Sequence, residues 1–470
     1  MNLCQRDASV HDGMLPGSSN LLDIVDRAKN GRLVKESDFE CRLLPNRLKE
    51  LVAQYDIRRD PEVLVPWDND LADSVFEAAK QLLVDLGVYC HDTGRTIKIT
   101  EEDVKDSLRN LPESTTIGSG KEARELRSRA VEDKRRPHFV GGNGGGICSS
   151  ASYLDIFTSM SMEPDVDSVC CGSLSEIDGK PIIGRSPVEL HAAQLEADWL
   201  RKAAERAGRP GLCLIGSGFE WAGADFASFN PDWGYRPTDA GCSCMIYPMK
   251  INFNMLAKTK HYLDRRMPIH AYSDQLIGGF TRGAEETLVS SVAHHLTNVI
   301  LNHATYQHVN CQHIHYNNTS NRLSIWSHNV AGQAIARNSR IVTSSECFAS
   351  AGPCTEMILY EGAAVALSVV SGLGLGPGIC GCATKEMDKF TGLEERFFGK
   401  VGRACAGMKR EDANDIAKQL VKKYEHRFDN PPLGKTFNEC YDPESMKPSK
   451  EWLDIYNRVI EEMKDLGFSL

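Results

Sequence analysis

The segment Gly208–Gly218, GRPGLCLIGSG, is the part of the sequence that decides the fold. It opens with a glycine- and proline-rich turn, continues as the apolar run Leu212–Ile215 and ends in Gly-Ser-Gly. A short apolar run bounded by turn residues predicts a buried β-strand. We therefore expect a strand whose carboxyl end, at Ile215, opens onto a glycine-lined space.

Runs of the same kind recur along the chain from about residue 137, and most are followed by a helical pattern. The predicted strands are His138–Val140, Ser168–Cys171, Leu212–Ile215, Cys242–Tyr247, Pro268–Tyr272, Cys311–Tyr316, Ile341–Ser345 and Gly378–Gly381. The predicted helices are 188–207, 248–264, 284–301, 320–337, 355–372 and 391–408. Strands alternating with helices predict a parallel sheet, and eight strands close a barrel. We predict an α/β fold, a (β/α)8 TIM barrel, with an open doubly wound sheet as the alternative.

The regions flanking this alternation have a different pattern. Residues 21–136 are mostly helical in pattern, with a Thr-x-x-Asp capping signature at Thr100, and form an expected N-terminal helical layer. Residues 1–20 are expected to be a flexible arm. The barrel is expected over 137–408, and 409–470 to be a helical extension that packs on it.

Composition and charge exclude some functions. The chain has 470 residues, a net charge of -10, and no segment with 18 uninterrupted apolar residues. The acidic balance argues against nucleic-acid binding, and the lack of a long apolar run argues against a membrane span. The 16 cysteines, without a secretory signal pattern, predict reduced thiols and a cytoplasmic protein. Neither GxGxxG nor a Walker pattern occurs in a suitable setting, so nucleotide binding is not supported.

Cysteine and histidine alternate on two of the predicted strands. One contains Cys242-Ser243-Cys244 and the other Cys311-Gln312-His313-Ile314-His315. Residues two apart in a strand face the same side, and alternate barrel strands supply the same interior layers. These side chains could therefore converge inside the barrel and bind zinc. The alternative is that the cysteines are core residues and the histidines are hydrogen-bonded interior residues.

Carboxylates near strand ends are candidates to face a ligand. Asp274 lies in the polar segment YSDQLIGG, which we expect to be a loop after the fifth strand. In a barrel of this class the active site is built at the carboxyl ends of the strands. Asp274 is therefore a candidate substrate-binding residue.

Motifs spread over about residues 21–470 resemble one known family. They are DRAKNG, LGVYCHDTGRTIKITEEDV, AGRPG, GAEET, AGPCTEM, TGLEERFFGKVGRACAGM and GKTFNECYD. In this order they resemble the monomethylamine:corrinoid methyltransferases. The resemblance implies a (β/α)8 barrel in a homohexamer that demethylates a methylated amine. It also implies that the methyl group passes to the Co(I) of a separate corrinoid protein, which docks over the barrel mouth, so no tightly bound cofactor is expected in this chain.

The sequence departs from that family at the positions that carry its chemistry. The family's pyrrolysine, thought to capture the amine, corresponds to Ile215, and a family glutamate corresponds to Cys242. A family glutamine and tyrosine correspond to Glu346 and Phe348. His313 matches a family histidine, whereas His315 replaces an arginine. The pyrrolysine chemistry therefore does not carry over.

Three functions remain compatible with these residues. The first is a pyrrolysine-free corrinoid methyltransferase whose donor is a methylated amine or a quaternary ammonium, held in an apolar pocket by cation–π contact. The second is a zinc-dependent methyltransferase acting on a methylated thiol, alcohol or ether. The third is a non-catalytic scaffold that binds the corrinoid protein.

The candidate residues are assigned to three roles. The expected catalytic residues are Cys242, His313 and Glu346. The expected substrate-binding residues are Ile215, Trp221, Asp274, His315 and Phe348. The expected metal ligands, if zinc is bound, are Cys242, Cys311, His313 and His315.

Overall fold

A curled parallel sheet lies at the centre of the molecule. The computed structural model describes residues 21–216, 218–370, 376 and 378–470. The sheet contains β5 (Val140–Gly142), β7 (Ser168–Cys170), β11 (Cys213–Gly216), β12 (Ala240–Cys244), β14 (Ile269–Ile277), β15 (Tyr306–His313) and β16 (Thr343–Ser344). They neighbour one another in chain order, as in a TIM barrel, whereas the order of a doubly wound sheet reverses near its middle. The predicted α/β class and parallel sheet are confirmed.

The last predicted strands continue beyond this sheet. β17 (Cys347–Phe348) follows β16 directly and pairs in parallel with β18 (Ile379–Cys380). The backbone N–H of Gly378, just before β18, donates to the carbonyl of Val140 in β5 over 3.1 Å. The two ends of the strand series are therefore in backbone contact.

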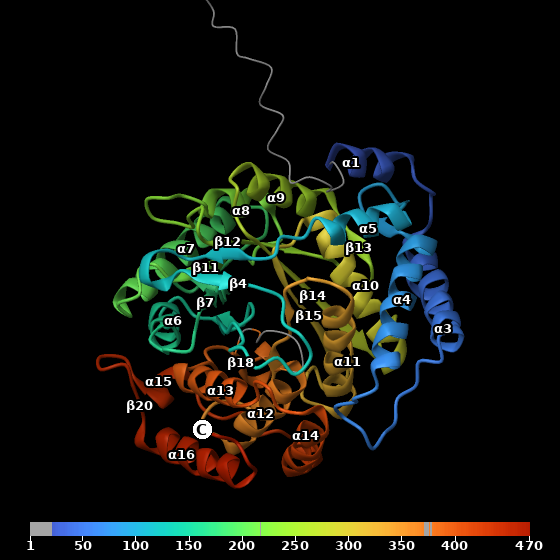
Figure 1. Cartoon of the computed structure of the whole chain (residues 1–470). Coiled ribbons are helices and arrows are strands. Elements are labelled where there is room, and N and C mark those ends of the chain that lie inside the picture. The colour runs from blue at the N-terminus through green and yellow to red at the C-terminus, as the bar shows by residue number, and fades with distance from the viewer. Residues whose placement is uncertain (1–20, 217, 371–375, 377) are drawn as a thin grey trace, which may run out of the picture.

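Helices surround the strands on their outer side (Figure 1). They are α6 (Tyr153–Ser161), α7 (Pro187–Arg206), α8 (Ala222–Ser228), α9 (Phe253–Asp264), α10 (Ala284–Asn302), α11 (Arg322–Asn338), α12 (Glu356–Val370) and α13 (Gly392–Ala404). Between β5 and α7 lie the short strands β6 (Ile147–Cys148), β8 (Ser173–Leu174), β9 (Glu176–Ile177) and β10 (Lys180–Pro181). η3 (Gly381–Thr384) follows β18. Most predicted helices agree with these bounds to within a few residues.

The N-terminal region packs against one side of the barrel-like core. It contains α1 (Leu21–Asn30), α2 (Glu36–Asp38), η1 (Phe39–Leu43), α3 (Leu44–Gln54), α4 (Asn69–Leu86), β1 (Val88–Cys90), β2 (Arg95–Ile97), α5 (Glu101–Arg109), β3 (Thr115–Ile117), η2 (Gly120–Glu122) and β4 (Arg124–Leu126). Helix α4 packs on α10 and α11, and Thr100 forms the predicted capping box at the start of α5. β1 also pairs with β13 (Lys250–Ile251), a strand between β12 and α9. The predicted flexible arm, residues 1–20, lies outside the described residues.

The C-terminal segment, shown in orange to red in Figure 1, covers a side of the core next to the N-terminal region, and the backbone N–H of Leu64 donates to the side chain of Asn414 over 2.8 Å. It contains α14 (Arg410–Tyr424), η4 (Glu425–Arg427), α15 (Phe437–Cys440), β19 (Tyr441–Asp442), β20 (Lys447–Pro448) and α16 (Lys450–Asp465). Both α14 and α16 pack on α12. Trp452 of α16 is fully buried, and its indole N–H donates to the Thr391 hydroxyl over 3.1 Å.

The strands β12, β14 and β15 differ from the sequence prediction in ways that affect the site. β15 begins at Tyr306, five residues before the expected start, and its last residue is His313. β12 ends at Cys244 rather than continuing to residue 247. β14 extends to Ile277, so Asp274 lies within a strand and not in a loop after it. The polar residues of β14 and β15 made these strands seem shorter in the sequence, because polar side chains that face a binding site resemble loop residues.

No helix within the described ranges has the length and apolar character needed to cross a membrane.

Glu361 of α12 holds the loops that follow two of the central strands. Its carboxylate is fully buried and accepts hydrogen bonds from the Ser320 hydroxyl (2.7 Å) and from the backbone N–H groups of Ser350 (2.8 Å) and Ala351 (3.0 Å). Burial raises the pKa of Glu361 to about 7. Because Ser320 lies after β15 and Ser350 lies after β17, this carboxylate fixes the rim of the core.

Glu361→Ala is expected to destabilise the fold by about 3 kcal/mol, because three donors lose their acceptor in a buried site. A raised pKa in the folded state gives a stabilisation that is complete below about pH 4.5 and is lost as the pH rises through about 7. Glu361→Gln should therefore show a smaller fall in stability between pH 5 and pH 8 than the wild type. Urea unfolding at both pH values measures both effects. Equal stability of Glu361→Ala and wild type would contradict this role.

Candidate functional site

Two carboxyl groups meet at the carboxyl ends of β14 and β16, bridged by two neutral side chains. The Tyr272 hydroxyl donates to Glu346 Oε1 over 2.6 Å and lies 3.2 and 3.1 Å from the two oxygens of Asp274. The Asn310 amide donates to Asp274 Oδ1 (3.0 Å) and to Glu346 Oε1 (3.1 Å). We call Asp274 and Glu346 the carboxyl pair. The predicted site residues Asp274 and Glu346 are therefore brought together.

The strand geometry explains this convergence. Tyr272 and Asp274 are two apart on β14 and face the same side, and Asp274 lies beside Asn310 of β15 in register. Glu346 follows β16, and its backbone N–H donates to the Asn310 side-chain oxygen over 2.9 Å. Three neighbouring strands thus contribute to one polar cluster.

Glu346 is fully buried and Asp274 is half-buried, and neither is compensated by positive charge. Burial, followed by the nearby charge of Asp274, raises the pKa of Glu346 well above its usual range, and burial raises the pKa of Asp274 to about 6. Among the described residues, no Lys, Arg or His side chain forms an ion pair with either group. Within the same residues, Glu346 Oε2 has no hydrogen-bond partner. Such a site favours a ligand that brings a positive charge.

The glycine-rich segment after β5 provides the space for Glu346. A Cβ on Gly144 would lie 2.7 Å from Glu346 Oε2 and 2.9 Å from Oε1, and Gly144 has a φ of +52°. Gly142, with a φ of +113°, donates its backbone N–H to Glu395 Oε1 over 3.3 Å. This segment is therefore glycine-rich where two buried carboxyl groups lie close to the backbone.

An apolar cluster lies on the same interior face of the strands. Ile215 and Cys242 are buried in it together with Cys170, Ala240 and Tyr306, and Cys244 and Tyr272 pack against it. Ile215 is fully buried and lies beside Ala240 and Cys170 in register. Tyr272 therefore contacts both the apolar cluster and the carboxyl pair.

Cys242 and Cys244 form a thiol pair on β12. Their sulfur atoms lie 3.8 Å apart, within hydrogen-bond distance for sulfur. The ammonium group of Lys258 is buried nearby, donates to the Phe219 carbonyl over 2.9 Å and lies 3.7 Å from Asp225 Oδ1. Burial lowers the pKa of Lys258, but Asp225 and the two thiols outweigh this effect and raise it.

The predicted convergence of Cys311, His313 and His315 with Cys242 is wrong. Because Asn310 lies beside Asp274 in register and bonds it, Asn310 faces the interior, and Cys311 faces the surrounding helices in the cluster that includes Leu288 and Trp326. His313 lies at the strand end, where its Nδ1 accepts from the backbone N–H of His315 over 3.3 Å and its ring stacks on Tyr316. His315 is exposed, and its Nε2 is 4.0 Å from Asp429.

The expected metal ligands therefore do not fit a zinc ion. In the described ranges, no three His, Cys, Asp or Glu side chains are grouped closely enough to hold a metal. Cys311 and His313 do share one face of β15, as predicted. That face points toward the helices, and the face that carries Asn310 points into the interior.

The remaining predicted residues lie around the polar cluster. Trp221 is half-buried at the N-cap of α8, and its indole packs over Gly223. Phe348 is 4% exposed on β17 and belongs to the large hydrophobic cluster beneath α12 and α13. No contact between either ring and the carboxyl pair is recorded among the described residues. Their assignment to substrate binding stays a prediction.

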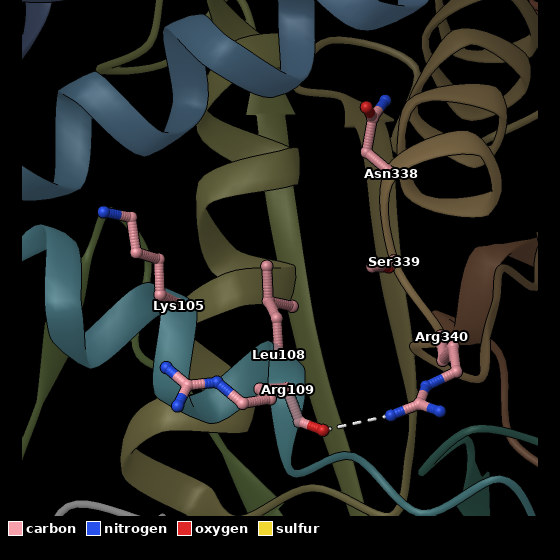
Figure 2. A pocket seen from close by; sticks show the side chains of 6 residues that line it. All are labelled: Lys105, Leu108, Arg109, Asn338, Ser339 and Arg340. Carbon is pink, nitrogen blue, oxygen red and sulfur yellow. Dashed lines mark hydrogen bonds between the residues drawn. The ribbon is translucent and has the colours of Figure 1, made fainter.

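Two cavities lie away from the carboxyl pair. One of about 620 Å³ is lined by Lys105, Leu108, Arg109, Asn338, Ser339 and Arg340 (Figure 2). It lies where α5 and α11 end, before β16, and Arg340 donates to the Arg109 carbonyl over 3.0 Å. Its charged lining side chains are all basic, so it does not suit a cation. The second, of about 320 Å³, is lined in part by His315, Tyr316 and Phe428 at the rim.

Three residues of this region were missed from the sequence. Tyr272 and Asn310 bridge the carboxyl pair, and Lys258 lies beneath the thiol pair. Tyr272 could have been found, because it is two residues from Asp274 on one strand. Asn310 depended on knowing where β15 begins, and the sequence around Lys258 resembles an ordinary amphipathic helix.

Comparison with known proteins gives consistent matches over nearly the whole chain. The family model described as monomethylamine methyltransferase MtmB matches residues 19–468. Monomethylamine methyltransferase MtmB1 of Methanosarcina acetivorans is 31% identical over 458 residues, covering 96% of this chain and 98% of that protein. MtmB of Methanosarcina mazei gives the same identity and coverage.

Solved structures agree with these matches. The crystal structure of the Methanosarcina barkeri monomethylamine methyltransferase MtmB superposes with a TM-score of 0.93 at 30% identity, covering 96% of this chain and 99% of that one. A crystal structure of a hydroxylamine complex of MtmB gives the same values.

Proposed function

Since the chain belongs to the monomethylamine methyltransferase MtmB family and is a methyltransferase, we propose that it transfers a methyl group from a methylated amine or quaternary ammonium. The acceptor is the Co(I) of a separate corrinoid protein. The curated relatives are named for monomethylamine. The donor proposed here differs because Ile215 stands where the family resemblance implies pyrrolysine.

The carboxyl pair is the observation that supports a cationic donor most strongly. Asp274 and Glu346 lie in one hydrogen-bonded cluster, with no ion pair to a described Lys, Arg or His. A bound ammonium would supply the missing positive charge, and the Tyr272 ring provides an aromatic surface beside it. An uncharged thioether or ether would leave the pair uncompensated.

The side chain of Ile215 cannot form an adduct with an amine. A methylated ammonium does not need one, because the nitrogen leaves as a neutral amine when the methyl group is attacked. In this account the carboxyl pair binds and orients the nitrogen, and the apolar cluster around Ile215 excludes water. The methyl group then faces the open end of the strands, where the corrinoid protein would dock.

Several further features are proposed on the family resemblance. We take the strands to close as an eight-stranded (β/α)8 barrel and the chains to assemble as a hexamer. Cys242 and His313 remain candidate catalytic residues, and the corrinoid is supplied by the partner protein. The alternative of a zinc-dependent methyltransferase has no structural support, because the side chains of its four expected ligands do not lie together.

The donor class can be tested by methylation of a Co(I) corrinoid protein. We expect methyl–cobalt absorbance with a quaternary ammonium or with a methylated amine other than monomethylamine, and none with methylated thiols or ethers. Efficient use of monomethylamine would show that the inference from Ile215 is wrong. Methyl transfer only from methylated thiols or ethers would favour a zinc-dependent methyltransferase. No transfer from any donor would favour a non-catalytic scaffold that binds the corrinoid protein.

A further inference from the structure

We propose that Cys244 is a methyl acceptor, so that this site also methylates its own cysteine without the corrinoid protein. This inference rests on the proposed cationic donor. It concerns a different acceptor, however, and is tested in the absence of cobalt.

Cys244 lies directly beside the proposed donor site. On the neighbouring strands β12 and β14, Cys244 pairs in register with Tyr272, whose hydroxyl bonds both members of the carboxyl pair. Cys244 and Tyr272 also pack against the same apolar cluster around Ile215. A cation held by the carboxyl pair would therefore present its methyl groups near this sulfur.

Cys244 is accessible, unlike the thiols around it. It is half-buried, whereas Cys170, Cys171, Cys213 and Cys242 are buried. Among the cysteines in the described ranges, only Cys41, which is exposed, is more accessible. Of these thiols, Cys244 is therefore the one that presents exposed surface to a small donor.

The surroundings of Cys244 favour its thiolate. The Cys242 sulfur at 3.8 Å can donate its proton to the Cys244 sulfur, and this hydrogen bond lowers the pKa of Cys244. The buried ammonium of Lys258 acts in the same direction, and together these two influences outweigh burial and the negative charges of Asp274 and Cys171, which raise the pKa of Cys244. Thiolates are the reactive form of cysteine, and positive charge nearby is the usual means of producing them.

The reaction is balanced without another reactant. The Cys244 thiolate supplies an electron pair to the methyl carbon, an S–CH3 bond forms, and the N–CH3 bond breaks with its electrons on nitrogen. A negative thiolate and a positive ammonium thus become a neutral thioether and a neutral amine. No oxidation or reduction occurs, and no proton is required.

A methylated sulfonium tests this activity without knowledge of the physiological donor. Trimethylsulfonium carrying deuterated methyl groups is a small cation and a reactive methyl donor. The full-length protein is incubated with it, without corrinoid protein, and peptide mass spectrometry measures labelling of each cysteine. Exposed Cys41 is the internal control for non-specific alkylation.

We expect Cys244 to be labelled at least about 10-fold faster than Cys41, as for an activated thiolate beside a binding site. Labelling should saturate with sulfonium concentration, be suppressed by tetramethylammonium, and fall in Asp274→Asn. A rate at Cys244 equal to or below that at Cys41 would overturn the proposal. So would labelling that is unchanged in Asp274→Asn.

The cobalt assay separates this proposal from the function on which it rests. If the wild type methylates the corrinoid protein but Cys244 is not labelled, the self-methylation is wrong and the methyl-transfer function stands. If Cys244 is labelled but no donor methylates cobalt, the corrinoid function is wrong and the thiol activity stands.

Discussion

Replacing Glu346 by glutamine is expected to lower kcat/KM for the methyl donor by about 100-fold, in line with the removal of one preorganised charged group from an active site. Glutamine keeps the length of the side chain and can still accept from Tyr272 and Asn310. It cannot ionise when a cation binds. The predicted loss therefore reports charge and not shape.

Glu394→Gln is the matched control for this substitution. Glu394 is a buried glutamate on α13 whose pKa is raised by burial to about 8, but its carboxylate accepts from Thr391, which also bonds Trp452 of α16. It lies away from the carboxyl pair in sequence and in its contacts. We expect nearly wild-type kcat/KM in Glu394→Gln. Equal losses in the two variants would mean that Glu346 has only a structural role.

Replacing Asp274 by asparagine is expected to weaken binding of tetramethylammonium by about 100-fold, the loss of one close charge partner in a buried site. Asp274 is the member of the carboxyl pair whose pKa stays closer to its ordinary range, at about 6 because of burial. At pH 7.5 it is therefore largely ionised in the empty site, whereas burial and the charge of Asp274 raise the pKa of Glu346 well above its usual range.

The ionisation of Asp274 predicts how the affinity for a cation depends on pH. Only the ionised form of Asp274 attracts a cation, so affinity should fall about 10-fold for each pH unit below about 6. Titration calorimetry from pH 5 to pH 8 measures this in the wild type. Asp274→Asn should show a much flatter profile at lower affinity. A wild-type affinity that rises as the pH falls would contradict the assignment.

The arrangement of the core could be predicted largely from local sequence patterns. The turn at Gly208–Gly211 and the run after it became β11, and the capping signature at Thr100 marks the observed start of α5. These features depend on a few neighbouring residues. Local steric and hydrogen-bond preferences are therefore enough to define them.

The site was predicted only in part, because it depends on strand register. Asp274 and Glu346 were found, one from its polar segment and one from the family resemblance. Cys311 and His313 were correctly expected to share one face of β15 but were assigned to the interior, which Asn310 faces instead. When a strand's polar residues face a binding site, the sequence does not distinguish that face from a solvated one.

The position of a bound methylated cation tests the central claim most directly. Tetramethylarsonium has the charge and shape of a quaternary ammonium, and its arsenic atom can be located in a crystal by anomalous scattering. We predict arsenic within about 5 Å of Asp274 and Glu346, the range over which opposite charges in proteins interact strongly, and no peak there in the Asp274→Asn, Glu346→Gln double variant. Arsenic bound elsewhere in the wild type, or an unchanged peak in the double variant, would contradict the account.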